Sequence, residues 1–273
     1  MKKNSSLIIG GIILIIIIIF SVVGPLVYNQ SSNYTDLYHT SEAPSVEHFL
    51  GTDETGRDIL ARLMEGGRVT IFVGLIATLF KMILSVVAGT LAGYFGGLAN
   101  QLLMRLADIV MCFPFYILAI SLAAILGPSI QNLVFIIAFF SWPASARLIA
   151  TEVQTIKNKE FVKYYEINGF SKWYILFKHI VPNIKSTLIV IFTLSVAQSI
   201  LMESSLSFLG LGVQAPYSSW GMMLSSAMNI LSIQREWWLW LPAGLLVLLM
   251  IFSIHLIGEG QKKRGGLVDA KSD

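Results

Sequence analysis

Charge is scarce in this sequence. Only 13% of its 273 residues are Asp, Glu, Lys or Arg, whereas 55% are hydrophobic. A soluble domain typically carries about twice that fraction of charge, so the composition argues against a soluble enzyme. The nineteen basic residues are spread through the chain and form no basic face, so the net charge of +3 does not indicate binding of nucleic acid.

Several chemical signatures are also missing. Cys112 is the only cysteine, which excludes a disulfide within the chain and a zinc site built from cysteines. The sequence has no Gly-x-x-x-x-Gly-Lys-Ser/Thr motif to cradle a nucleotide phosphate and no His-Glu-x-x-His motif. The ten methionines are dispersed and form no metal-binding cluster. We therefore expect no catalytic residues, no metal site and no cofactor in this chain.

Long apolar runs dominate what is present. A hydrocarbon core about 30 Å thick requires roughly 20 apolar residues of helix. The first run follows two lysines and is not followed by a small-x-small cleavage site, which favours an uncleaved anchor over a signal peptide. The sequence predicts an all-α membrane protein with six transmembrane helices, at Leu7–Tyr28, Thr70–Phe95, Asp108–Leu126, Ile130–Ile149, Ile184–Phe208 and Leu239–Ile257.

The distribution of lysine and arginine predicts the orientation of these helices. Five lysines lie in the segment 151–183, whereas the segment 29–69 leans acidic. Because cytoplasmic loops carry the excess of basic residues, both termini are expected in the cytoplasm. The expected domains are an N-terminal anchor (1–28), an extracytoplasmic segment (29–69), a membrane domain (70–260) and a tail (261–273) whose basic triplet meets anionic lipid headgroups.

The cytoplasmic segment 151–183 is too apolar for a free linker and too polar to insert in the membrane. A helix beginning near Glu160 is expected to end at Gly169, which tolerates a left-handed backbone. Ser171 can cap a second short helix, and Pro182 can open the next span. The result is a helix–turn–helix element with an aromatic surface, and exposed surfaces of that kind usually mark a docking site.

This segment resembles the cytoplasmic coupling loop of the inner-membrane permease subunits of ATP-binding-cassette importers. Gly169 matches the glycine of the family pattern, and His179-Ile180-Val181-Pro182 matches its ending, but Tyr164 and Tyr165 stand where the family has two alanines. The departure leaves open how deeply the helix enters a groove of the ATPase. The resemblance implies contact with the ATPase by Glu160, Phe161, Val162, Tyr164, Tyr165, Gly169, His179 and Pro182.

A second group of motifs narrows the resemblance. Leu50-Gly51-Thr52-Asp53 is followed by Gly56-Arg57-Asp58, and Gly93-Tyr94-Phe95-Gly96-Gly97 and Glu203-Ser204-Ser205-Leu206-Ser207-Phe208-Leu209-Gly210-Leu211-Gly212 come later. From residue types alone, the first motif is a polar turn that starts a helix at Asp58, or a solvated ion-paired loop. Together, and in order over about residues 7–260, these motifs resemble the C-type permease of dipeptide, oligopeptide and nickel importers.

The resemblance implies the type I importer permease fold, a multi-pass location in the plasma membrane of a prokaryote, and a set of partners. These are a sister permease in a heterodimer, two ATPase subunits that bind ATP and Mg²⁺, an extracytoplasmic solute-binding protein and membrane lipid. Peptide is the preferred solute, with nickel or a metal–chelator complex as the alternative. A competitor of another class is an ion-driven secondary carrier, which would require paired intramembrane charges, discontinuous helices or an inverted repeat.

Ionisable residues within the spans are costly in lipid and are therefore candidates for function. Lys81 has three interpretations: an ion pair with Glu203, snorkelling of its ammonium to the interface, or lining of the translocation path. Asp108 is expected at the cytoplasmic start of the third span, where a helix N-terminus stabilises a carboxylate.

Phe113-Pro114-Phe115 places a proline among bulky aromatic residues early in the same span. A kink in the helix is expected there, and Phe113 or Tyr116 is a further candidate for narrowing the path.

Overall fold

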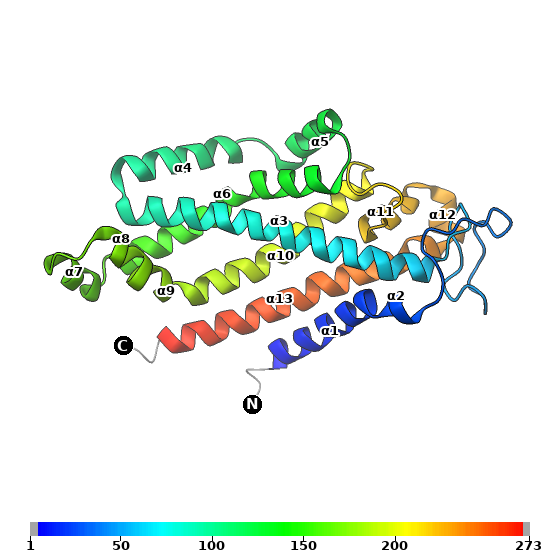
Figure 1. Ribbon diagram of the computed structural model, residues 1–273, viewed down its shortest axis with the longest axis horizontal. Coiled ribbons are helices and arrows are strands. Elements are labelled where there is room, and N and C mark those ends of the chain that lie inside the picture. The colour runs from blue at the N-terminus through cyan, green and yellow to red at the C-terminus, as the bar shows by residue number, and fades with distance from the viewer. Residues whose placement is uncertain (1–4, 270–273) are drawn as a thin grey trace.

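The structure is a computed structural model that describes the backbone from residue 5 to residue 269 and side chains up to residue 262. This part of the chain is almost entirely helical and contains no β-strand (Figure 1). The helices long and apolar enough to cross a membrane are α1 (Ser5–Val22) continued by α2 (Gly24–Val27), α3 (Ile59–Phe95), α6 (Ile130–Lys157), α10 (Lys185–Phe208) and α13 (Leu241–Asp269).

The third predicted span is broken. It consists of α4 (Gly97–Met111) and α5 (Phe115–Leu126), which meet at an angle of 79°. Pro114 lies at the break, where it has no N–H to donate and its ring would clash with the preceding helical turn. The predicted kink is confirmed in a stronger form, whereas a continuous helix beginning at Asp108 is wrong. With the bent pair counted as one span, the six predicted spans are present.

Close contact between α3 and α6 forms the centre of the bundle. A Cβ atom on Gly89 would lie 2.7 Å from the carbonyl oxygen of Ala146, and one on Gly93 would lie 2.6 Å from that of Ala150. Helices in lipid associate through such close approaches because the hydrophobic effect does not drive them together. The small residues at 88–93 therefore serve packing within this subunit.

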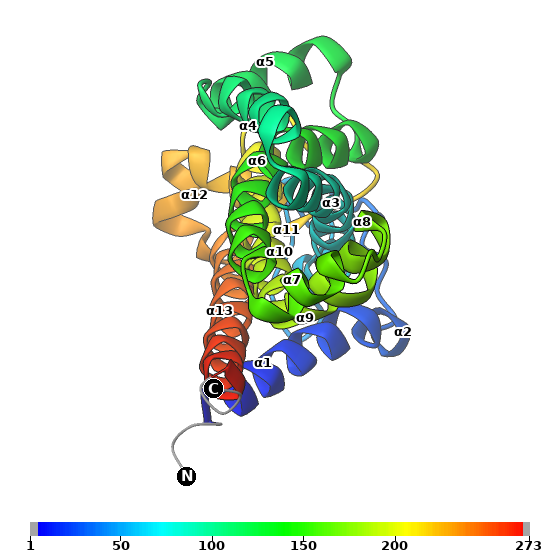
Figure 2. The ribbon, with the colours of Figure 1, turned by 90° about the vertical axis from the view of Figure 1, so that its left-hand side faces the viewer.

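The first and last helices lie side by side, so the described ends of the chain are at the same end of the bundle (Figures 1 and 2). Gly10 lies against Ser253, and Gly260 lies against Leu7. This arrangement is the one expected for an even number of crossings.

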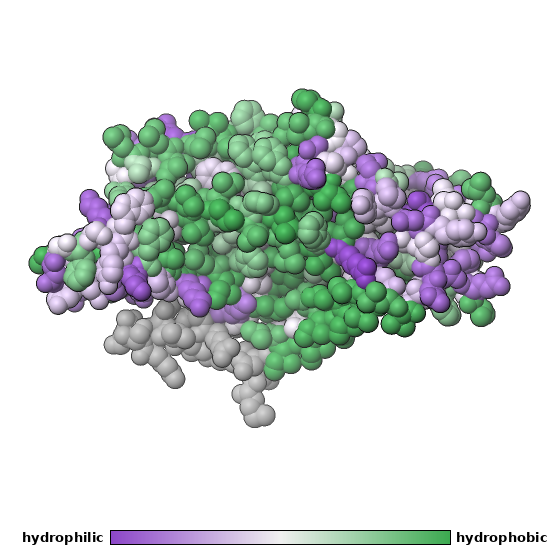
Figure 3. Space-filling view, viewed as in Figure 1, coloured by the Kyte–Doolittle hydropathy of each residue, from purple (hydrophilic) through white to green (hydrophobic). Residues whose placement is uncertain are grey.

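On the face drawn in Figure 3, apolar residues form a belt across the middle of the molecule, and polar residues are concentrated at its two ends. One polar end contains α7 (Glu160–Ile167) and α8 (Lys172–Ile175), and the other contains residues 29–58, α11 (Trp220–Leu224) and α12 (Ile230–Arg235). Within the belt, Ile15 is 58% exposed and Phe72 is 56% exposed. Such exposure is compatible with lipid as the solvent.

Helix lengths differ from the apolar runs that predicted them. α3 begins at Ile59 and not at Thr70, and α6 continues to Lys157 beyond Ile149. The 37 residues of α3 span about 55 Å, which exceeds a hydrocarbon core of about 30 Å. An apolar run marks the part of a helix that lipid surrounds, whereas capping groups decide where the helix begins and ends.

Candidate functional site

The loop between α6 and α10 has the predicted helix–turn–helix geometry. α7 ends in a left-handed Gly169 with φ of +76°. The N–H of Gly169 donates to the carbonyl oxygen of Glu166 at 3.1 Å, and the N–H of Phe170 donates to that of Tyr165 at 3.2 Å. This pair of bonds is the Schellman motif, and a ring contact between Phe170 and Tyr165, with centroids 5.3 Å apart, completes it.

The second half of the loop begins at a side-chain cap. Ser171 Oγ accepts a hydrogen bond from the N–H of Tyr174 at 3.2 Å, and α8 starts there as predicted. A π-helical turn (Leu176–Ile180) and α9 (Val181–Asn183) connect α8 to α10. Pro182 lies in the first turn of α9, where a missing N–H costs least.

Buried aliphatic residues fix this loop to the bundle. Val162, Ile175, Leu176 and Ile180 are completely buried. They pack in one cluster with the ends of α3 and α6, which contribute Tyr94, Ile149, Val153 and Ile156. The loop is therefore a rigid extension of the bundle.

The two tyrosines that replace the family's alanines have different environments. The Tyr165 ring stacks on that of His179 with centroids 3.9 Å apart, and Tyr174 packs against the other side of His179 at 5.5 Å. Tyr164, in contrast, is 63% exposed. Tyr165 therefore stabilises the loop itself, whereas Tyr164 faces the surroundings.

We call the exposed side of this loop the docking face. Its large side chains are 42–84% exposed and are Tyr164, Ile167, Phe170, Trp173, Tyr174 and Phe177. Of the coupling residues expected from the sequence, Glu160, Tyr164, Gly169 and Pro182 are exposed, Phe161, Tyr165 and His179 are partly buried, and Val162 is buried. The structure thus brings these residues into one element. The exposed ones can contact a partner, whereas the buried ones support the loop.

Sequence reasoning did not single out Trp173, Phe177 and Glu166, three residues of the loop that matter for this element. Trp173 packs on Phe95 of α3 with ring centroids 5.1 Å apart and on Phe177 at 6.0 Å. Glu166 accepts a hydrogen bond from the hydroxyl of Tyr94 at 3.5 Å. The density of aromatic residues in the segment was the available signal, but their partners on α3 are distant in sequence.

At the opposite end, the Gly-Arg-Asp motif anchors the start of α3. Asp58 caps the helix by accepting from the N–H of Ala61 at 2.8 Å. Its other carboxylate oxygen contacts His48 Nδ1 at 2.9 Å and the hydroxyl of Tyr28 at 3.1 Å. Asp58 starts the helix as predicted and also connects the segment 29–58 to it.

The neighbouring Asp53 forms ion pairs with Arg57 at 2.8 Å and with Arg62 at 3.0 Å. The side chains of Asp53 and Arg62 are 14% and 6% exposed, so the loop is ion-paired but not solvated. Burial by itself would raise the pKa of Asp53, but the charge of Arg62 and hydrogen bonds from Arg57 and Thr55 outweigh it and hold that pKa below its ordinary value.

Inside the apolar belt, Lys81 and Glu203 do not form an ion pair, which was one of the three interpretations of Lys81. Lys81 Nζ donates to the side-chain oxygen of Gln198 at 2.8 Å. Glu203 is fully buried and accepts hydrogen bonds from the hydroxyls of Ser207 at 2.8 Å and Ser204 at 3.3 Å. The pairing was wrong because the two side chains reach different neighbours along α10.

Asp108 also differs from its expected environment. It lies inside α4 and not at a helix N-terminus, and it forms an ion pair with Arg147 of α6. Sequence reasoning overlooked Arg147. This arginine lies near the end of the predicted span Ile130–Ile149, where a charge requires a partner.

The aromatic candidates near the helix break are both accessible. Phe113 is 55% exposed, and Tyr116 is 42% exposed. The Tyr116 hydroxyl donates to Ser205 Oγ of α10 at 3.4 Å, so α5 reaches the C-terminal part of α10 at this point.

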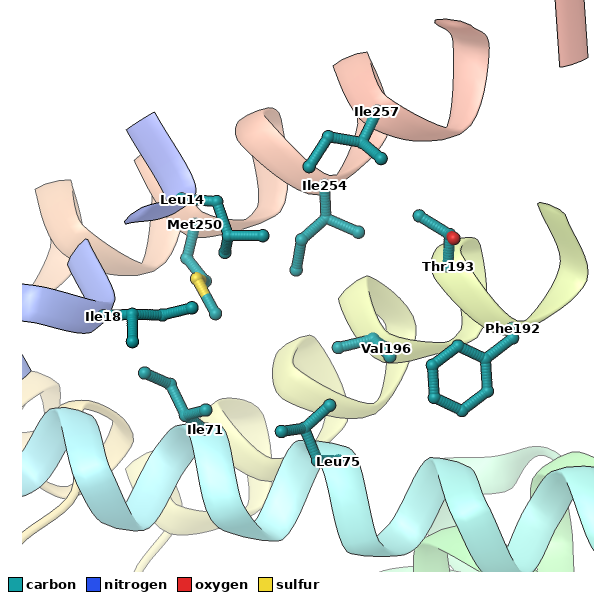
Figure 4. Close-up of a pocket in the computed structure, with 10 residues that line it drawn as sticks. All are labelled: Leu14, Ile18, Ile71, Leu75, Phe192, Thr193, Val196, Met250, Ile254 and Ile257. Carbon is teal, nitrogen blue, oxygen red and sulfur yellow. The ribbon is translucent and has the colours of Figure 1, made fainter. Parts of the chain in front are cut away.

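A pocket of about 220 Å³ lies between α1, α3, α10 and α13 (Figure 4). Its lining is aliphatic and aromatic except for Thr193, and it includes Leu14, Ile71, Val196 and Met250. Among the described residues, no group of three or more His, Cys, Asp or Glu side chains could hold a metal ion. The pocket is therefore apolar and is not suited to a polar ligand.

Comparison with known proteins assigns the family. Residues 85–264 match the model of the binding-protein-dependent transport system inner membrane component, and residues 1–44 match the N-terminal transmembrane domain of oligopeptide transport permease C. A dipeptide transport system permease protein of Alkalihalophilus pseudofirmus is 37% identical over 260 residues, covering 95% of this chain and 85% of the relative.

Two further relatives extend the comparison. An oligopeptide transport system permease protein of Bacillus subtilis is 34% identical, covering 95% of this chain and 84% of the relative. A glutathione transport system permease protein of Pectobacterium atrosepticum is 36% identical, covering 84% and 76%. With its apolar belt, its six spans and these matches, the chain is a multi-pass membrane protein that belongs to the family of binding-protein-dependent transport system inner membrane components.

Proposed function

We propose that this chain is a permease subunit of an ATP-driven peptide importer and forms the translocation path together with a sister permease. The observation that carries the proposal is the docking face: a capped, rigid element with six large exposed hydrophobic side chains at one polar end of a membrane bundle. A surface of this kind on a membrane subunit is suited to binding a soluble partner.

The partner at the docking face is an ATPase subunit, and each of the two permeases contacts one. ATP and Mg²⁺ bind in those subunits, because the present sequence has no phosphate-binding loop. The lysines near the docking face support a cytoplasmic location for this face and for both termini. Since the loop packs directly on α3 and α6, a displacement of the ATPase is transmitted to the spans as a rigid-body motion.

The other polar end receives a solute-binding protein from outside the cell. Residues 29–58 are held to α3 by Asp58 and to the short 3₁₀ turn that precedes α13 by Trp238, whose indole N–H donates to the carbonyl oxygen of Thr52 at 3.4 Å. A docked protein at this end therefore contacts a surface connected to two spans.

Two observations favour peptides over nickel as the solute. The names of the three relatives described above refer to a dipeptide, an oligopeptide and glutathione. In addition, Lys81 lies within the belt without an ion-pair partner among the described residues. We infer that Lys81 lies close to the path, where its ammonium opposes the passage of a bare divalent cation because charges interact strongly in a low dielectric.

An ion-driven carrier would also use a broken helix and intramembrane charges, both of which occur here. However, the carboxylate of Asp108 is occupied by Arg147, and Glu203 is held by serine hydroxyls. Neither carboxylate is arranged as an open ion site, and the family assignment agrees with ATP-driven import.

The test is uptake by the reconstituted complex. The chain is purified with its sister permease and two ATPases, placed in proteoliposomes, and supplied with binding protein and a labelled dipeptide or tripeptide. We expect uptake that requires ATP and the binding protein. Uptake driven by an ion gradient without ATP would contradict the proposal, and so would ATP-dependent uptake of nickel but not of peptide.

A further inference from the structure

Lys81 is a buried charge within the apolar belt with little compensation. Its side chain is buried on α3, with 1% of the residue exposed. Its ammonium carries three N–H groups but forms one hydrogen bond, to Gln198 Oε1 at 2.8 Å. No carboxylate among the described side chains lies within ion-pair distance of it. The positive charge of Lys81 is therefore free to polarise the amide of Gln198 and to attract a negative group near it.

The hydrogen bond determines how Gln198 is oriented. An ammonium can only donate, so the amide oxygen of Gln198 must face Lys81 and its NH₂ group must point away. Gln198 is exposed on α10, and its NH₂ group has no partner among the described residues. A positive charge at the oxygen polarises the amide, which makes the NH₂ group a stronger donor.

The exposed face of α10 around Gln198 is partly polar. Leu194, Gln198, Leu201 and Ser205 follow one another at helical spacing and form a stripe along α10. Leu194 is 39% exposed and Leu201 is 48% exposed, and the hydroxyl of Tyr116 contacts Ser205 at 3.4 Å. An exposed amide at this depth is costly against lipid, so water or protein covers the stripe.

We propose that Gln198, backed by Lys81, is a contact point on the translocation path for the C-terminal carboxylate of the transported peptide. The proposal rests on the function proposed above and names the solute group involved. The amide NH₂ donates to a carboxylate oxygen, and the ammonium behind it stabilises the negative charge. A C-terminal carboxylate is common to peptides of every side-chain composition, so one site of this kind serves many solutes.

Two variants of the reconstituted complex test this role, Lys81→Met and Gln198→Met. Both replacements preserve an unbranched side chain of similar length and remove the charge or the donor. The measured quantity is the uptake ratio of a dipeptide with a free C-terminus to its C-terminal amide. The same binding protein is used throughout, so its own preference cancels between variants.

The matched control is Thr78→Val. Thr78 also connects α3 to α10, through hydrogen bonds from its hydroxyl to Ser199 Oγ at 2.9 Å and to the carbonyl oxygen of Ser195 at 3.2 Å. It is completely buried and does not reach the exposed stripe. Loss of bracing between the helices would therefore affect this variant as well, whereas loss of carboxylate recognition would not.

We expect wild type to prefer the free carboxylate, and both methionine variants to reduce the uptake ratio about tenfold. Thr78→Val is expected to retain the wild-type ratio. An unchanged uptake ratio in both methionine variants would overturn the inference but would not contradict the proposed function in peptide import. The methionine variants could instead lose assembly with the sister permease while the complexes that remain keep an unchanged uptake ratio. This result would also overturn the inference and would indicate that a carboxylate of the sister permease contacts Lys81. Absence of peptide uptake by wild type would contradict the proposed function and this inference together.

Discussion

Replacing Gly169 with valine tests whether the turn between α7 and α8 couples this subunit to its ATPase. The backbone at Gly169 has φ of +76°, a conformation that costs a β-branched residue about 3 kcal/mol. No atom lies within 4 Å of a Cβ built at this position, so the perturbation is conformational and not a clash. The substitution therefore changes the turn without adding a competing contact.

The magnitude follows from the contacts that hold the turn. The two Schellman hydrogen bonds and the Ser171 cap each contribute about 1 kcal/mol. Their sum of about 3 kcal/mol corresponds to an ordered-to-disordered ratio of roughly 100 to one. Strain of about 3 kcal/mol in Gly169→Val nearly cancels this stabilisation, so about half of the subunits should lose the native turn.

The assay compares peptide uptake and peptide-stimulated ATP turnover in proteoliposomes. Gly169→Val should lower both to about half of the wild-type value or less, while the complex still co-purifies. Gly169→Asn should remain close to wild type because asparagine tolerates the left-handed conformation. The matched control is Gly127→Val, since Gly127 has φ of +80° and equally open surroundings in the turn between α5 and α6. Wild-type coupling in Gly169→Val, or an equal loss in Gly127→Val, would refute the reasoning.

Two further predictions concern packing and pH. Gly89→Ala places a methyl group 2.7 Å from the carbonyl oxygen of Ala146 and should destabilise the subunit by about 1–3 kcal/mol. Gly11→Ala has open space around it and should be neutral or slightly stabilising. Thermal unfolding in detergent distinguishes the two variants, and equal melting temperatures would contradict the packing argument. The pKa of Asp53 is held below 3.8, so its ion pair with Arg62 should stabilise residues 29–58 fully above pH 3.8 and lose this effect as pH falls through the lowered pKa. Tryptophan fluorescence should show an acid transition in wild type that Asp53→Asn abolishes, and a transition that persists unchanged in this variant would assign it to another group.

Local features of the fold were predictable from short stretches of sequence. Gly169 and Ser171 specify the turn and the cap between α7 and α8 because both act through backbone groups a few residues away. Asp58 starts α3 for the same reason. Pro114 predicted a disruption of the third span, but the 79° angle between α4 and α5 depends on how the two helices pack on α6.

Partners between helices were not predictable in the same way. Lys81 and Glu203 were candidates for a pair because both are charged and lie in spans, yet Lys81 contacts Gln198 and Glu203 contacts serines. The rotation of α10 about its axis and its offset along α3 decide which side chains meet. These quantities come from packing at small residues such as Gly74, which lies against Ile200 of α10, and hydropathy patterns do not record them.

The sequence by itself therefore determined the solvent, the number of spans and the local geometry of the loop between α6 and α10, because apolar length and capping act over one helix at a time. Only the tertiary structure decided that Asp108 pairs with Arg147, that Tyr165 supports the docking face while Tyr164 belongs to it, and that Lys81 lies behind an exposed amide. Each of these contacts joins segments far apart in the chain, and their meeting depends on how the helices pack together.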